Sequence, residues 1–138
     1  MPAPGSRTFK SSNDPPEPAD SPAIGLAVIE AGEKVHIILR RRFKEDQRRH
    51  FVGTVSSVSA GQMRVVGYTF SFNATSSAFQ RLPELRTRIF GLFDSSYVIN
   101  VLPPQVDIDR LRYHTNPGVL VMTDGQGFKL EIDDSATA

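Results

Sequence analysis

The chain has 138 residues, close to the usual size of one domain, and 39% of them are hydrophobic before its 10 glycines are counted. It contains no cysteine, which excludes disulfides, thiolate metal sites and a cysteine nucleophile. We find no apolar run of about 18 residues and no apolar leader segment, so we expect no membrane-spanning helix and a cytoplasmic location.

The net charge is +1, but it is spread unevenly along the chain. Residues 34–49 carry seven cationic and two acidic side chains, a net charge of +5. Residues 94–138 carry three cationic and seven acidic side chains, a net charge of −4. Such asymmetry suits nucleic-acid binding, and it equally suits contact between the two segments, within one subunit or between two.

The first 23 residues contain six prolines and, apart from Phe9, no large apolar residue. A segment of this composition has too little apolar surface to offset the entropy lost on ordering. We therefore predict a flexible Pro-rich tail at residues 1–23, a single β-domain at 24–132, and a second flexible tail at 133–138.

From Ile24 onward, hydrophobic side chains alternate with polar ones, which is typical of β-strands. The predicted strands are 35–39, 51–55, 66–72, 89–93, 97–102, 119–122 and 128–132. Their close spacing, with turn residues between them, indicates an all-β, mainly antiparallel fold that forms a small barrel or β-roll.

The connections between these strands are rich in Gly, Asp and Ser. Residues 59–61, 94–96 and 123–127 predict hairpin turns, and 43–48 predict a longer, charged hairpin tip. Residues 75–85 are expected to form a loop with one helical turn. After Pro103 and Pro104, which end a strand, Asp107 is expected to cap one short helix.

Two of these strands share a pattern with a known family. Gly32, Val35, Ile37 and Leu39 are followed by the Phe51-x-Gly53-x-Val55 segment. This pattern resembles the opening strands of small SH3-like barrels of the Sm-like kind. The resemblance implies a small barrel, assembly into rings and binding of RNA. Arg64 stands where that family carries Asn, so the resemblance does not extend to the family's RNA pocket.

The candidate partner-binding residues form one basic segment with an aromatic side chain inside it. They are Arg40, Arg41, Arg42, Phe43, Lys44, Arg48 and Arg49. Cations neutralise phosphates and aromatic rings stack on bases, so this composition suits single-stranded nucleic acid. Glu45 and Asp46 reduce the charge. A solvated loop, a protein partner or the chain's own acidic end explains the pattern as well.

Other residues with chemical potential have simpler interpretations. His36, His50 and His114 lie far apart in sequence and have no metal-ligand spacing, so His36 is interpreted as a half-exposed strand histidine. Asp107 and Asp109 flank a turn after two prolines, and helix capping explains them more simply than acid–base chemistry does. We therefore predict no metal site, no cofactor and no catalytic residue.

The sequence contains no recognisable catalytic or phosphate-loop motif. We interpret the chain as a non-catalytic binding or assembly module that presents a basic hairpin, residues 40–49, to a partner. Self-association or a protein partner is preferred, and no membrane partner is expected. The alternative is a small barrel that binds single-stranded nucleic acid such as RNA. A small enzyme is the least supported interpretation.

Overall fold

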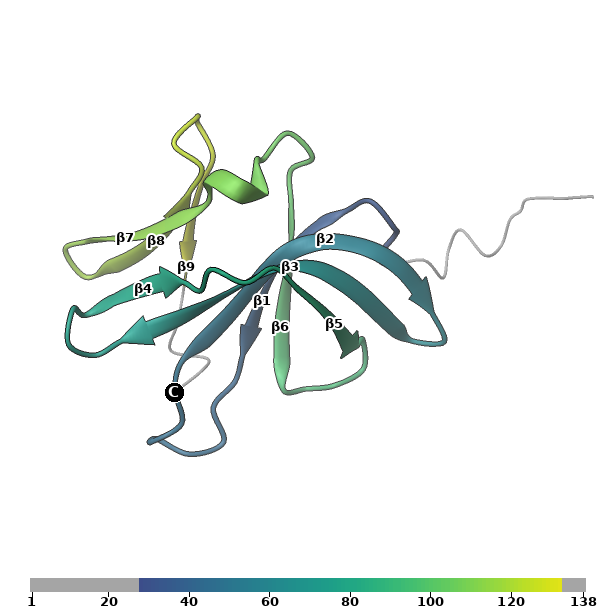
Figure 1. Ribbon diagram of the computed structural model, residues 1–138, viewed down its shortest axis with the longest axis horizontal. Coiled ribbons are helices and arrows are strands. Elements are labelled where there is room, and N and C mark those ends of the chain that lie inside the picture. The colour runs from purple at the N-terminus through teal and green to yellow at the C-terminus, as the bar shows by residue number, and fades with distance from the viewer. Residues whose placement is uncertain (1–27, 133–138) are drawn as a thin grey trace, which may run out of the picture. The chain divides into compact units, whose positions relative to one another are not determined.

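The computed structural model describes residues 28–132, so the predicted tails at 1–23 and 133–138 lie outside the described residues. The chain divides into two units, Met1–Glu30 and Ala31–Ala138. Every strand that the structure describes belongs to the second unit, which is therefore considered by itself (Figure 1).

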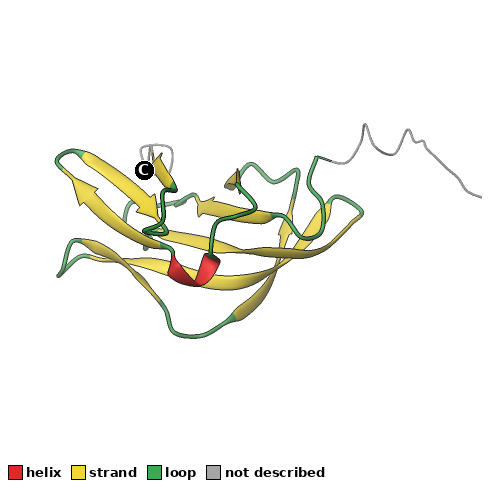
Figure 2. Cartoon of the chain, turned by 90° about the horizontal axis from the view of Figure 1, so that it is seen from above, coloured by secondary structure: helices red, strands yellow, loops and turns green. Residues whose placement is uncertain are grey.

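Nine strands and one short 3-10 helix, η2, make up the described part of this unit (Figures 1 and 2). They are β1 (Lys34–Leu39), β2 (Arg49–Ser59), β3 (Gln62–Asn73), β4 (Ala78–Arg81), β5 (Arg86–Gly91), β6 (Tyr97–Leu102), η2 (Ile108–Arg110), β7 (Arg112–Asn116), β8 (Val119–Thr123) and β9 (Lys129–Ile132). The prediction of an all-β fold is confirmed.

The strands form two antiparallel sheets. The larger sheet has the order β4-β3-β2-β1-β6, and β5 also pairs with β3. The smaller sheet has the order β7-β8-β9. Backbone pairing does not close the described strands into a barrel. The prediction of a mainly antiparallel architecture is therefore confirmed, and the prediction of a closed barrel is not.

Strand β3 divides its length between two partners, because residues 62–67 pair with β5 and residues 70–73 pair with β4. Near this division, Gly53 of β2 lies opposite Gly67 of β3. A Cβ atom added to Gly67 would lie 1.9 Å from the carbonyl oxygen of Val52, and one added to Gly53 would lie 2.4 Å from that of Val66. The backbones approach so closely here that only glycine fits at either position.

The central strands are buried on both faces. On one face, Ile38, Val52 and Phe70 pack against hydrophobic residues that include Met122 and Ile132 of the smaller sheet. On the other face, Val35, Ile37 and Phe51 are equally buried, and the Phe51 ring lies 5.5 Å from that of Phe90. Polar side chains among these buried positions, such as His36 and His50, are therefore enclosed and need hydrogen-bonding partners inside the protein.

Two predicted connections are wrong, and the predicted hairpins at 59–61, 43–48 and 123–127 are confirmed, since Ser59 pairs with Gln62, Leu39 with Arg49 and Thr123 with Lys129. The segment 75–85 holds strand β4 instead of a helical turn, and residues 94–96 do not form a hairpin, because β5 pairs with β3 while β6 pairs with β1. The hairpin at 123–127 joins β8 to β9 as predicted. Asp107 caps the 3-10 helix by accepting a hydrogen bond from the backbone of Asp109 at 3.0 Å.

Strand β7 is absent from the sequence-based strands, because its residues are mostly polar. Within residues 28–132, no helix is long and apolar enough to cross a membrane.

Candidate binding surface at the β1–β2 hairpin

The basic hairpin, residues 40–49, contains the whole connection between β1 and β2 and the first residue of β2. Leu39 pairs with Arg49, so the two strands are in register where the loop begins and ends. The backbone N–H of Arg40 donates to the carbonyl oxygen of Ser96 at 2.9 Å, which fixes the start of the loop against the β5–β6 connection. The predicted hairpin at this position is therefore confirmed.

Asp46 organises the loop itself. Its Oδ2 atom accepts hydrogen bonds from the backbone N–H groups of Arg42 and Phe43, both at 3.1 Å. Its own N–H donates to the carbonyl oxygen of Phe43 at 3.1 Å. The carboxylate that seemed in the sequence to dilute the positive charge is thus a structural acceptor that holds the loop backbone in one shape.

The loop exposes most of the predicted binding residues to solvent. Phe43 keeps 64% of its surface exposed, although a large apolar side chain gains free energy from burial. Exposed cations accompany this ring: Arg40, Arg42, Lys44 and Arg49. These five residues are thus exposed on one loop and the strand end beside it, and Arg40 and Arg49 also line a common hollow.

The remaining two arginines are half-buried and make internal contacts. Arg41 donates from Nη1 to the carbonyl oxygen of Lys44 at 3.1 Å. The guanidinium carbon of Arg48 lies 4.8 Å from the centre of the Phe72 ring and 5.3 Å from that of Phe79. Burial, and secondarily the charge of Arg41, lowers the pKa of Arg48. We therefore assign Arg48 a packing role beside the surface formed by the exposed cations.

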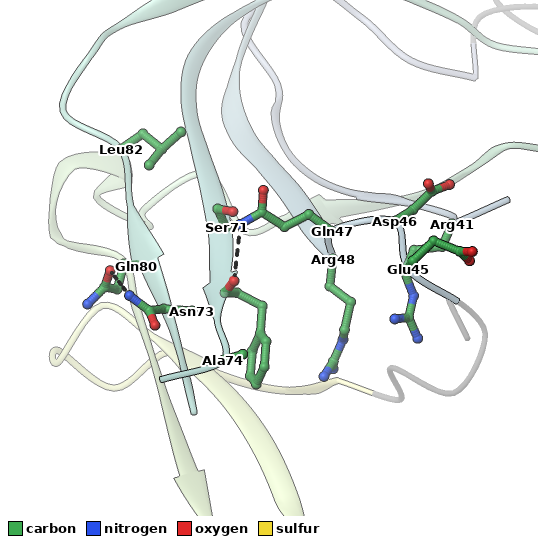
Figure 3. Close-up of a pocket in the computed structure, with 11 residues that line it drawn as sticks. Arg41, Glu45, Asp46, Gln47, Arg48, Ser71, Asn73, Ala74, Gln80 and Leu82 are labelled. Atoms are coloured by element: carbon green, nitrogen blue, oxygen red, sulfur yellow. Dashed lines mark hydrogen bonds between the residues drawn. The ribbon is translucent and has the colours of Figure 1, made fainter. Parts of the chain in front are cut away.

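Two hollows flank the hairpin. The larger, about 650 Å³, lies between the loop and strands β3 and β4, and Figure 3 shows its lining. Both signs of charge line it, since Arg41 and Arg48 are balanced by Glu45 and Asp46. The Gln47 side chain donates to the carbonyl oxygen of Phe72 at 3.2 Å across its floor (Figure 3).

The second hollow, about 280 Å³, lies beside the strand ends and is named the small hollow. Its lining consists of Leu39, Arg40, Arg41, Asp46, Gln47 and Arg49. Three arginines and one acidic residue thus line it, whereas two arginines and two acidic residues line the larger hollow, and Arg41 and Asp46 belong to both. Neither hollow is lined by a histidine.

The β5–β6 connection carries an exposed aromatic residue that the sequence analysis missed, and its ring lies beside Gly61 of the β2–β3 turn. Phe93, in the β5–β6 connection, is 92% exposed. Asp94 beside it has a lowered pKa, chiefly because the backbone of Ser96 donates to its carboxylate and to a smaller extent because of Arg42. The signal for Phe93 was present in the sequence as a large apolar residue at the start of a turn.

A separate cluster of polar side chains is enclosed between the two sheets. His36 and His50, both fully buried, lie diagonally on one face of β1 and β2, because His36 pairs with Val52 and His50 with Ile38. His36 Nε2 lies 3.1 Å from His50 Nδ1. The interpretation of His36 as half-exposed is wrong, because the smaller sheet covers the face that the alternation had assigned to solvent.

Tyr113 of β7 and Asn100 of β6 complete this cluster. The Tyr113 hydroxyl lies 2.7 Å from His50 Nδ1 and 3.0 Å from His36 Nε2, and Asn100 Nδ2 lies 3.1 Å from His36 Nδ1. Because the Asn100 amide donates to Nδ1, the neutral His36 ring carries its proton on Nε2, and the Tyr113 hydroxyl donates to His50. The hydrogen bonds thus run in one direction, from Asn100 through His36 and Tyr113 to His50.

Burial keeps this cluster uncharged. It lowers the pKa of His36 to about 4, and it lowers that of His50 to about 3 with smaller contributions from His36 and Arg48. Burial also raises the pKa of Tyr113 well above 10. Residues 28–132 contain no cluster of three or more His, Cys, Asp or Glu side chains that could hold a metal ion. The geometry is that of a neutral hydrogen-bonded network.

The other predicted residues are dispersed. His114 is exposed on β7, whereas His36 and His50 are buried. Asp107 and Asp109 are exposed at η2, where Asp107 serves as the cap.

Comparisons with known proteins find no match: no family model, no curated protein and no solved structure resembles this chain. The resemblance to Sm-like barrels therefore stays a prediction from the sequence.

Proposed function

We propose that this protein is a non-catalytic binding module that presents the basic hairpin, residues 40–49, to an anionic partner. The observation that carries the proposal is the exposed Phe43 ring among exposed cations, on a loop whose backbone is held by Asp46. A preformed loop loses little conformational entropy on binding, and cations attract an anionic partner over a distance set by the salt concentration.

The polar groups elsewhere support binding in preference to catalysis. General acid–base catalysis needs a titratable group within reach of a substrate and with a pKa near the working pH. His36 and His50 are enclosed and have pKa values far below that range, and the carboxylate of Asp107 is used for capping. The lack of cysteine suits a reducing compartment, and the proposed location is the cytoplasm.

The proposal is tested with three exposed cations of the hairpin. We expect the triple variant Arg40→Gln, Arg42→Gln, Lys44→Gln to bind a fluorescent ten-nucleotide thymidine oligomer at least tenfold more weakly than the unmodified chain. Fluorescence anisotropy in 50–200 mM salt measures the affinity. The matched control Arg64→Gln, Arg110→Gln, Lys129→Gln removes the same charge elsewhere.

Polyglutamate, titrated in parallel, represents an acidic protein partner. Equal affinities of the two triple variants for both probes would contradict the proposal, because the hairpin would then contribute nothing beyond net charge.

Self-association is the second candidate, and the edges of the larger sheet favour it. Strand β6 pairs with β1 alone among the described strands, and its Val101 is 53% exposed. An edge strand with an exposed β-branched residue is a template for pairing with a second copy. We further class the larger sheet as a β-roll, since the rings of Phe90 in β5 and Tyr97 in β6 lie 5.2 Å apart without strand pairing. Light scattering that finds a monomer at every salt concentration removes the assembly proposal.

A further inference from the structure

We propose that the small hollow beside the ends of β1 and β2 is a phosphate site, and that the phosphate belongs to a single-stranded nucleic acid whose neighbouring base stacks on Phe43. This inference rests on the proposed function and names the class of ligand that the basic hairpin binds.

The composition of the small hollow is the first argument. Arg40, Arg41 and Arg49 line it together with a single acidic residue, Asp46. That carboxylate already accepts two backbone hydrogen bonds through Oδ2, so its negative charge is directed at the loop backbone. A guanidinium group offers five donors in a planar fork that matches the oxygens of an anion, and a phosphate has enough oxygens to accept from more than one of the arginines that line the hollow.

The fixed backbone around the small hollow is the second argument. Arg40 is tied to Ser96, Arg49 begins β2 opposite Leu39, and Arg41 is held by the carbonyl oxygen of Lys44. The three arginines therefore project from positions that are defined before any ligand arrives. An anion bound in the small hollow would be attracted by each of the three arginines that line it.

Size is the third argument. Pockets for drug-sized ligands occupy about 300–1,000 Å³, and the small hollow, at about 280 Å³, lies below that range. It has room for a phosphate group, and the rest of a larger ligand would continue across the surface. The larger hollow is less suited to an anion, because its two arginines face two carboxylates.

Phe43 identifies what continues from the phosphate. The ring belongs to the same loop, lies outside the small hollow and is 64% exposed. Bases of any sequence stack on an exposed aromatic ring, whereas an acidic peptide offers no flat partner for it. Phosphate in the hollow and a base on the ring together describe a single strand, whose bases are free to turn outward, and disfavour a duplex.

The test compares three probes with the full-length protein: inorganic phosphate, the ten-nucleotide thymidine oligomer, and an abasic deoxyribose-phosphate chain of the same length. In ¹H–¹⁵N NMR spectra at constant ionic strength, inorganic phosphate should shift the signals of residues 39–41 and 49, and chloride should not. The thymidine oligomer should shift these signals and those around Phe43, whereas the abasic chain should shift only the former set.

Variants separate the two parts of the site. Arg49→Gln and Arg40→Gln should each lower the affinity for the thymidine oligomer about tenfold. Each should also reduce the slope of log K against log salt concentration by about 0.7, the value for one phosphate contact on a single strand. Phe43→Ala should lower the affinity for the thymidine oligomer without changing that slope, and it should leave the affinity for the abasic chain unchanged. Arg110→Gln, which removes an exposed charge at η2, is the control and should change neither quantity.

The outcomes distinguish this inference from the proposed function. If Arg49→Gln and Arg40→Gln behave like the control while Lys44→Gln weakens binding, the phosphate site is wrong and the basic hairpin remains the binding surface. If polyglutamate binds as tightly as the thymidine oligomer and ignores Phe43→Ala, the nucleic acid is the wrong partner. If no hairpin variant affects any probe, the proposed function itself is overturned.

Discussion

Two neighbouring residues at the start of β2 belong to opposite regions of this protein. Arg49 is exposed and lines the small hollow, whereas His50 is fully buried in the polar network between the sheets. Successive side chains of a strand point to opposite faces, so one step along the chain separates a surface that keeps its charge from a network that has none. Polar residues in this protein therefore have two roles, at the binding surface and in the buried network. Substitutions at the surface should change binding, and substitutions in the network should change stability.

The largest expected effect concerns acid stability and arises from the buried network. His36 and His50 bind protons below pH 6.5 in the unfolded chain, but in the folded protein only near pH 4 and pH 3. The contribution of the two neutral histidines to the free energy of unfolding is therefore fully present above about pH 6.5. It declines as the pH falls below that value, until the pKa values of the folded protein are reached. We expect a loss of about 2 kcal/mol for each histidine between pH 7.5 and pH 5.

Urea unfolding followed by circular dichroism at several pH values measures this dependence. The double variant His36→Leu, His50→Leu serves as the control, and its free energy of unfolding should vary much less over the same range. A wild-type curve as flat as that of the double variant would show that the two histidines are not held neutral by the fold.

The second prediction removes a single oxygen atom from the network. Tyr113→Phe deletes the hydroxyl that lies between His36 and His50, and we expect it to lower the free energy of unfolding by about 1–2 kcal/mol. The loss is limited because the two rings remain 3.1 Å apart and can bond directly. Tyr97→Phe is the control, with an expected change below about 0.5 kcal/mol. Equal losses in the two variants would argue against a hydrogen-bonded role for Tyr113.

The smallest effect concerns the basic hairpin. Asp46→Ala removes the acceptor for two backbone N–H groups, and we expect a loss of about 0.5–1 kcal/mol together with faster amide exchange at Arg42 and Phe43. Glu45→Ala removes the same charge from the next position and should change stability by less than about 0.5 kcal/mol. If the exchange rates rise equally in both variants, the loop is not organised by Asp46.

The strands could be located from sequence better than their partners could. Alternation identifies β1, β3 and β8 because each has one clearly apolar face. It cannot identify β4 or β7, whose short segments are mostly polar or exposed. The predicted hairpin at 94–96 failed for a different reason: turn residues indicate where a chain reverses, but they do not indicate that β5 pairs with β3 and β6 with β1, both distant in sequence.

The candidate site shows the same division between local and long-range information. The cluster of cations with Phe43 is local, so the sequence alone located it. The network of His36, His50 and Tyr113 is not local, because β7 joins it from more than sixty residues further along the chain. Alternation placed His36 opposite Val35 correctly, but it gave no sign that the smaller sheet would cover that face.

The glycine pair at positions 53 and 67 constrains both related and redesigned sequences that adopt this fold. Because no side chain of any size fits at either position, every variant that keeps the fold must keep both glycines, however far the rest of its sequence drifts. Distant relatives of this protein are therefore best identified by a pair of facing glycines on adjacent long strands, even when the rest of their sequence is no longer similar.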